Sequence, residues 1–241
     1  MTNEKRVEIL EKTKIWFKTG VMEKHIVNTR KLTSPSEFNI NPFLVTYLAT
    51  FLTGNASPES IAKALVYPRV LGTSITTSFG THMQKFTSEV LSSYASTTSG
   101  IDIEFIDVID KRRKYCQLKA GPNTINKDDV KTIVDHFKSV KNLARTNNLN
   151  ISLNDLIVGV IYGDESQLSS HYKSITSQHD HPVFVGSDFW YRLTGDKNLY
   201  FDLIKAVGEV ISESDFSEGL QDTINKLASH PQIIKISQSV L

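Results

Sequence analysis

The first hundred residues carry hydrophobic positions at helical spacing. Val7, Leu10 and Phe17 recur at intervals close to a helical turn or two, with Lys and Glu between them. This spacing predicts an amphipathic helix. Residues 42–52 are almost wholly apolar and are followed by Gly54. We therefore expect a buried helix that ends at this glycine.

A further helix is marked by its start signal. Ser57 is a good N-cap residue, and Pro58 suits the first helical position. We expect this helix to end at Pro68, because proline cannot continue the hydrogen-bond ladder. Apolar residues at helical spacing between residues 79 and 91 predict another amphipathic helix.

The hydrophobic period changes from helical to alternating after Gly100. In residues 101–105, I-D-I-E-F, apolar side chains alternate with Asp102 and Glu104, which predicts a strand. Residues 110–114 are polar and are expected to form a turn. Residues 115–120 should then form a second strand of a hairpin.

The remaining sequence alternates helical and strand patterns. The expected elements are a helix over 127–147, a doubly covered strand over 156–162, a short strand over 183–186, and helices from 187 to about 230. This order predicts an α/β fold with a small mixed β-sheet flanked by helices, preceded by an N-terminal helical segment. We expect one domain over residues 1–241, in which 76–215 form the core and 1–75 could stand apart as a helical annex.

Composition narrows the class of protein only slightly. Charged residues make up 22% and hydrophobic residues 39% of the 241 residues, and the formal net charge is +1. These values are ordinary for a globular protein, so a polyanionic partner would have to meet a local basic patch. The single cysteine, Cys116, excludes an intramolecular disulfide and fits a reducing compartment. The charged N-terminus lacks an apolar signal core, and residues 42–52 are too short to cross a bilayer, so we expect a cytoplasmic protein.

Polar side chains of the predicted hairpin favour metal-dependent phosphodiester chemistry. Residues two apart in a strand share a face, so Asp102 lies with Glu104, and Gln117 lies with Lys119. Hairpin pairing would bring the four side chains together. Carboxylate oxygens hold Mg²⁺, which polarises a phosphoryl oxygen and lowers the pKa of bound water. Lys119 would orient that water or stabilise charge on the phosphate.

The spacing of these residues resembles a known nuclease signature. Asp102, followed fifteen residues later by Gln117-Leu118-Lys119, is similar to the PD-(D/E)XK motif. Gln117 stands where the motif has its second acid, and an amide oxygen can bind a metal without bringing a negative charge. Glu104 or Glu89 is a candidate to restore that charge. The resemblance implies catalytic roles for Asp102, Gln117 and Lys119.

The longer strings around the motif resemble type II restriction endonucleases, in particular the PmeII-like group. They are G-I-D-I-E-F (100–105), Q-L-K-A-G-P-N-T-I-N-K-D-D-V (117–130), T-S-F-G-T-H-M-Q-K-F (77–86) and V-G-S-D-F-W-Y-R-L-T-G-D (185–196). The resemblance implies a Mg²⁺-dependent homodimer that cuts both strands of double-stranded DNA at GC-rich palindromes of the GGNCC sort. It also implies a cognate DNA methyltransferase that protects the host genome.

Two segments near the motif are candidates for contacts with the DNA backbone. The loop that leads into the helix at residue 127 supplies amide and hydroxyl groups from Asn123, Thr124 and Asn126. Alternatively, the loop only caps the helix that follows, since Asn126 is also a natural N-cap. The basic run consists of Lys111, Arg112, Arg113 and Lys114. Its alternative is an ordinary solvated turn.

Two other functions remain open at this point. A repair or recombination nuclease could use the same core. A DNA-binding protein that has lost its activity is the second alternative, and Gln117 is the feature that favours it.

Overall fold

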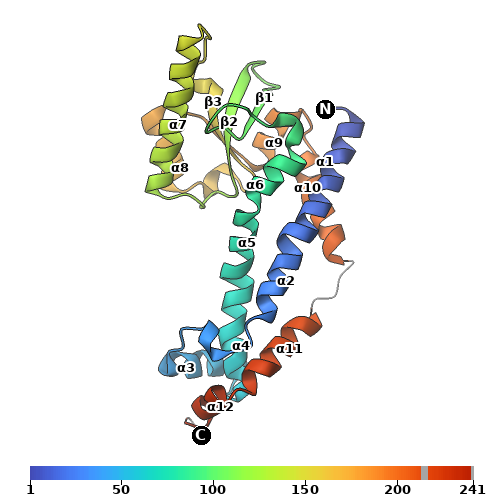
Figure 1. Cartoon of the computed structure of the whole chain (residues 1–241), viewed down its shortest axis with the longest axis vertical. Helices are drawn as coiled ribbons and strands as arrows, with labels where there is room; N and C mark the ends of the chain where they lie inside the picture. The colour runs from blue at the N-terminus through green and yellow to red at the C-terminus, as the bar shows by residue number, and fades with distance from the viewer. Residues whose placement is uncertain (213–216, 240–241) are drawn as a thin grey trace. The chain divides into compact units, whose positions relative to one another are not determined.

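The chain forms two compact units in the computed structural model, which describes residues 1–212 and 217–239. The sheet unit comprises Met1–Trp16 and Met83–Glu209, and the helical unit comprises Phe17–His82 and Val210–Leu241 (Figure 1). We expected a single domain with a possible helical annex over residues 1–75. In the structure, the helical unit starts at Phe17 and also includes the chain from Val210 onward. The sequence does not reveal this division, because it depends on contacts between distant parts of the chain.

The sheet unit is built on four strands in the order β1-β2-β3-β4. The strands are β1 (Ile103–Ile106), β2 (Arg113–Lys119), β3 (Leu156–Val160) and β4 (Val183–Val185). β1 pairs with β2 in the antiparallel direction, whereas the β2–β3 and β3–β4 pairs are parallel. The predicted α/β fold with a small mixed sheet flanked by helices is therefore confirmed.

The helices of the sheet unit connect the parallel strands and cover the sheet. They are α1 (Asn3–Trp16), α6 (Met83–Lys85), α7 (Lys127–Thr146), α8 (Ser170–His179), α9 (Gly186–Thr194) and most of α10 (Leu199–Ser212). Short 3₁₀ and π-helical segments join them: η4 (Phe86–Val90), η5 (Ser92–Tyr94), η6 (Leu153–Asp155) and η7 (Glu165–Gln167). The helix expected between residues 79 and 91 is interrupted at His82.

Both faces of the sheet are covered, as the continuous apolar run of β3 predicts. Helices α7 and α8 pack on one face, where Phe137 and Tyr172 are fully buried against alternate residues of β3 (Figure 1). Helix α9 covers the other face through Phe189. A Cβ atom at Gly159 would lie 2.4 Å from the ring of Phe189, so a glycine is needed where this helix meets β3.

The helical unit consists of helices from both ends of the chain. They are η1 (Phe17–Met22), α2 (Glu23–Arg30), η2 (Pro35–Glu37), α3 (Pro42–Thr53), α4 (Pro58–Pro68), η3 (Arg69–Ser74), α5 (Ile75–Thr81), α11 (Ser217–Ala228) and α12 (Pro231–Gln238). Ser57 caps α4 as expected, since its hydroxyl accepts a hydrogen bond from Ser60 N–H. The α-helix ends at Pro68, as predicted, and the chain continues directly as the π-helical η3, whose wider turns follow the position at which proline offers no N–H.

Helix α3 has the predicted ends but not the predicted burial. Asn41 caps its start, and Gly54 ends it with a positive φ of 81°. Only Val45 and Ala49 are buried in the helix, while its large side chains are exposed. The expectation of a buried helix is therefore wrong. No helix in the described ranges has both the length and the apolar character required to cross a membrane.

Candidate active site

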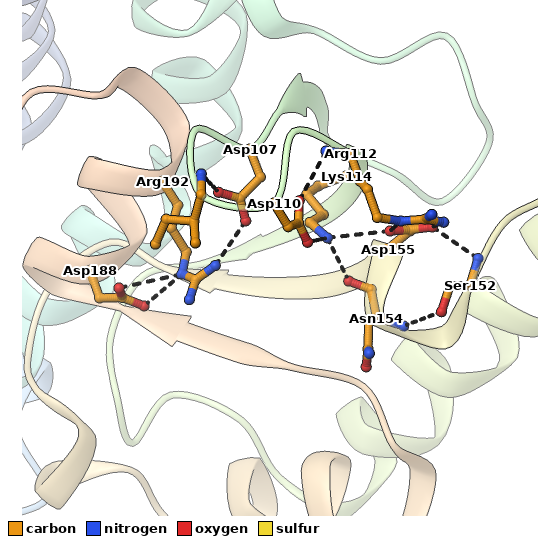
Figure 2. A network of polar contacts seen from close by, with 10 residues as sticks. Asp107, Asp110, Arg112, Lys114, Ser152, Asn154, Asp155, Asp188 and Arg192 are labelled. Atoms are coloured by element: carbon orange, nitrogen blue, oxygen red, sulfur yellow. Dashed lines mark hydrogen bonds and ion pairs between the residues drawn. The ribbon is translucent and has the colours of Figure 1, made fainter.

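A buried charge cluster fixes the turn of the β1–β2 hairpin to β3. Lys114 is 1% exposed, and its ammonium donates to the carboxylates of Asp110 and Asp155 and to the carbonyl of Asn154 (Figure 2). The Arg112 guanidinium donates to both oxygens of Asp155. Burial alone would raise the pKa of Asp155, but these donors together lower it.

A second ion pair ties the same turn to α9. Asp107 is fully buried, and its carboxylate accepts a hydrogen bond from Arg192 at 2.9 Å (Figure 2). Arg192 also pairs with Asp188 one helical turn earlier. The hairpin that carries the candidate catalytic residues is therefore held from two sides. Sequence analysis missed Asp107 and Asp155, because only the fold brings their partners to them.

The basic run does not form one solvated patch. Lys114 lies in β2 and points inward, so the expectation that it contacts DNA is corrected. Arg112 is half-exposed but is committed to Asp155. Lys111 donates to the carbonyl of Val108, and Arg113 is exposed with one pair, to Glu104. Lys111 and Arg113 are thus the members of the run with the most access to solvent.

Asp102 lies at the start of the hairpin, one residue before β1. Its N–H donates to Cys116 O at 3.0 Å, although Cys116 pairs with Ile103 in the sheet. Two residues therefore oppose one, as in a β-bulge, and strand alternation does not extend to Asp102. Its carboxylate instead accepts from the N–H of Leu118 at 2.7 Å. Asp102 thus reaches the middle of the Gln117-Leu118-Lys119 segment, as the hairpin model requires.

The carboxyl of Asp102 is in an environment that disfavours its charge. Although the residue as a whole is exposed, its carboxyl group is turned toward β2, and loss of hydration raises its pKa. The Leu118 N–H and the positive charge of Lys119 oppose this rise without cancelling it. A cation beside this carboxylate would stabilise its charged form.

Lys119 lies at the end of β2, and its positive charge acts on the carboxylate of Asp102. Its side chain is half-buried. In the described part of the chain, no carboxylate lies within ion-pair distance of its ammonium, and no hydrogen-bond acceptor is within reach. A half-buried ammonium without such a partner is available to a negatively charged ligand.

Gln117 is buried and its amide is fixed. Its Nε2 lies 2.6 Å from the carbonyl oxygen of Gly100 and 2.7 Å from Nδ1 of His136 on α7. A carbonyl oxygen only accepts, so the amide nitrogen must face it, and Nδ1 of His136 then accepts the second N–H. Both donors are used, which leaves Oε1 as the atom available to a cation. His136 was missed by sequence analysis, because it stands between the apolar positions of α7 and carries no local signal.

Glu104 shares the sheet face of its partner Tyr115 and is engaged by its neighbours. Its carboxylate accepts hydrogen bonds from Ser96 at 2.6 Å and Thr98 at 2.9 Å, and pairs with Arg113. Burial acts to raise its pKa, but these contacts lower it overall. Glu104 is therefore ionised and held away from Asp102 by its own donors.

Glu89 lies on η4 and is exposed. Its carboxylate is 3.6 Å from Lys85 Nζ, one turn earlier. Within residues 1–212 and 217–239, no three His, Cys, Asp or Glu side chains gather closely enough to hold a metal ion. A cation at this hairpin would therefore have few protein ligands.

The residues present nevertheless fit Mg²⁺, which commonly keeps several waters and takes only one or two carboxylates from the protein, plus substrate phosphates. Asp102 supplies one carboxylate that lacks full hydration. Gln117 supplies a fixed amide oxygen. The donor set is therefore all oxygen, as a hard cation requires.

The loop after Lys119 is built chiefly around a helix cap. The Asn126 side chain accepts from the N–H groups of Asp128 and Asp129, and Asp129 accepts from Asn126 N–H. The Thr124 hydroxyl bonds to Gly121 within the loop. Asn123 is exposed, and in the described structure its side chain has no hydrogen bond. Of the predicted backbone contacts, Asn123 is thus the one whose side chain is uncommitted.

Comparison with known proteins places the chain in a family. The family model described as type II restriction endonuclease EcoO109I matches residues 40–215, well over half of the chain. The matched segment contains the whole sheet and every candidate residue of the hairpin. A search of curated proteins finds no match. The chain belongs to the family of type II restriction endonucleases represented by EcoO109I.

Proposed function

We propose that this chain is a Mg²⁺-dependent restriction endonuclease that cuts both strands of DNA at a short GC-rich palindrome of the GGNCC type. The family supports site-specific cleavage of DNA. The observation that carries the catalytic assignment is the unpaired, half-buried ammonium of Lys119 beside the poorly hydrated carboxylate of Asp102. Unpaired opposite charges of this kind are typical of sites where a charged ligand completes the arrangement.

Each residue of the hairpin has one role in the proposed reaction. Asp102 holds the cation through its carboxylate, and Gln117 holds it through Oε1. When bound, Mg²⁺ would supply Lewis-acid chemistry at the scissile phosphate and at a coordinated water. Lys119 stabilises the negative charge that grows on the phosphate oxygens and orients the attacking water. Glu104 and Glu89 are not needed as ligands, since Glu104 has its own donors and Glu89 pairs with Lys85.

The DNA contacts proposed around this hairpin follow from exposure. Lys111 precedes β2, Arg113 begins it and Asn123 follows it, and all three are exposed. Thr124 and Asn126 offer only the remaining hydrogen-bonding capacity of their side chains. Contacts of this kind position the duplex without reading its sequence.

A palindromic site matches a protein with a two-fold axis, so the active enzyme is a homodimer in which each copy cuts one strand. An enzyme with this activity acts on DNA in the cytoplasm and needs a cognate methyltransferase that modifies the host's own sites.

The experiment is a digest of unmethylated phage DNA with and without Mg²⁺. Discrete fragments that require Mg²⁺ support the proposal. Shortening from ends or cutting at junctions would indicate a repair nuclease, and intact DNA with a gel shift would indicate an inactive binder, the function that Gln117 keeps open. Either result would refute the proposal.

Lys119→Ala tests the site itself. It should lower the cutting rate by roughly 10²–10³-fold or more while the affinity for DNA changes little, because the lysine acts on transition-state charge. The matched control is Lys131→Ala on α7, which removes an exposed lysine outside the hairpin. Equal cutting by wild type and Lys119→Ala would show that the site is wrongly assigned.

A further inference from the structure

A polar groove lies in the helical unit between α2 and the η3–α5 segment, hereafter the α2–α5 groove. Its volume is about 600 Å³, and its described lining residues all fall between residues 24 and 82. Helices α2 and α5 lie side by side (Figure 1), and Nε2 of His25 is 3.0 Å from the carbonyl oxygen of Val70, which ties α2 to η3. The groove therefore belongs to one unit, and to a unit that contributes nothing to the catalytic hairpin.

Positive side chains line both walls of the α2–α5 groove. Lys24 and Lys31 lie on and directly after α2, and Arg69 begins η3. All three are exposed, and in the described ranges no carboxylate lies within ion-pair distance of them. Glu37 is the acid among the described lining residues, so three positive charges face one negative charge when His82 is neutral. This excess attracts an anion.

Hydroxyl groups fill the wall formed by η3 and α5. They come in two series spaced four residues apart: Thr73, Thr77 and Thr81, and Ser74 and Ser78. Thr73 donates to the carbonyl of Arg69 at 3.3 Å, whereas the other four hydroxyls have no hydrogen bond in the described structure. Ser78 lines the groove yet is only 6% exposed. A buried hydroxyl without a partner is unfavourable, and an acceptor oxygen in the groove would satisfy it.

The lining does not suit a nucleobase or an apolar metabolite. Pockets for such ligands are lined mainly by hydrophobic and aromatic side chains, with few polar groups. Leu32 is the apolar residue among the described lining residues, and none of them is aromatic. A ligand rich in negative oxygens, without a flat ring to stack, is what this chemistry matches.

We propose that the α2–α5 groove binds the sugar–phosphate backbone of DNA. Proteins contact phosphate and sugar mainly through Arg, Lys, Ser, Thr and Asn side chains. The groove presents all five kinds, since Asn28 stands between the two lysines. Its volume leaves room for a phosphate together with the adjoining sugars. The choice of DNA rests on the proposed function, because a nuclease of this family has DNA as its substrate. The contact adds affinity and carries no sequence information.

The test measures binding of the full chain to a labelled duplex of random sequence by fluorescence anisotropy. EDTA keeps the duplex intact, and the titration is repeated over a series of salt concentrations. Arg69→Ala and Lys31→Ala should each lower the slope of log affinity against log salt by about 0.9, because each removes one phosphate contact. The same loss corresponds to about eightfold weaker binding at about 0.1 M salt. Thr77→Val should weaken binding without changing the slope, since a hydroxyl releases no counterion.

The matched control is Lys235→Ala, which removes the same charge as Lys31→Ala from an exposed lysine of α12 in the same unit, outside the groove. It should leave the affinity and the salt slope unchanged. Thermal melting checks that each variant is folded, which is expected because the substituted side chains are exposed.

Duplex binding by Arg69→Ala and Lys31→Ala equal to that of wild type would overturn the proposal. A titration with inorganic phosphate in a calorimeter separates DNA from a free anion. Phosphate binding that Arg69→Ala abolishes, with duplex affinity unchanged, would show a site for a small anion and would also overturn the proposal. A chain whose duplex binding depends on the groove, but which leaves phage DNA intact in Mg²⁺, would refute the proposed function and leave the backbone contact standing.

Discussion

Removal of the charge of Asp155 should destabilise the sheet unit strongly. In Asp155→Asn the ammonium of Lys114 stays buried and loses a carboxylate 3.3 Å away. Breaking a buried ion pair from one side usually costs about 3–5 kcal/mol. Asp110 remains beside Lys114, and Arg112 can turn to water because it is half-exposed. We therefore expect a loss near the lower limit, about 3 kcal/mol.

The assay is urea unfolding followed by tryptophan fluorescence. The chain has two tryptophans, and both Trp16 and Trp190 are buried in the sheet unit, so the signal reports on that unit. Lys114→Met combined with Asp155→Asn should recover much of the lost free energy of unfolding, because no unpaired charge is left inside. The control Asp135→Asn removes an exposed carboxylate of α7 and should change stability by less than about 0.5 kcal/mol.

The pH dependence of stability is a second test of the same cluster. The pKa of Asp155 is lowered in the folded state, so its contribution is present above the unfolded value, about 3.9, and is lost as the pH falls through the folded value. The difference between wild type and Asp155→Asn should therefore shrink in acid below that range. A loss under about 1 kcal/mol at pH 7, or a double variant no more stable than the single one, would refute this account of the hairpin.

Three further changes test the candidate site. Asp102→Asn should abolish cutting yet raise the melting temperature at pH 7, because the raised pKa of Asp102 means that folding disfavours its charged form. The gain in melting temperature should disappear in acid. A lower melting temperature than wild type at pH 7 would contradict the argument. His136→Leu should weaken DNA binding measured by calorimetry in Ca²⁺ but change binding in EDTA little. His136→Asn should restore the Ca²⁺-dependent binding, because its Oδ1 can replace Nδ1 as acceptor. Equal behaviour of the two variants would show that His136 does not orient Gln117. Gly100→Ala should reduce both stability and cutting, since φ is +76° and the added Cβ would lie 2.6 Å from the ring of His136; thermal melting equal to wild type would contradict the strain.

Local signals in the sequence predicted much of the fold. The caps Ser57 and Asn126 work where they were expected, because a cap depends on residues within one turn. The alternating run after Gly100 predicted β1, and the helical stripe after residue 127 predicted α7. These patterns depend on which face of an element meets the core, which a single sequence records directly.

The errors arose where distant residues decide the outcome. The apolar composition of α3 predicted burial, but only the fold determines which half of a helix meets a core. Lys114 appeared to belong to a solvated turn, because Asp155 lies 41 residues away in sequence. The fixed amide of Gln117 depends on His136 and Gly100, neither of which has a sequence pattern that marks it as a partner. The role of a residue in a site is therefore less predictable from one sequence than the element that carries it.

The division of the helical unit between residues 17–82 and 210–241 has a consequence for biosynthesis. α4 packs against α11 and α12, and Ile61 of α4 shares its buried cluster with Ile224 and Ile233. During translation, this cluster stays incomplete until the last helices have left the ribosome, whereas the whole sheet is synthesised earlier. A chain that lacks α11 and α12 would therefore have a complete sheet but an incomplete core in its helical unit.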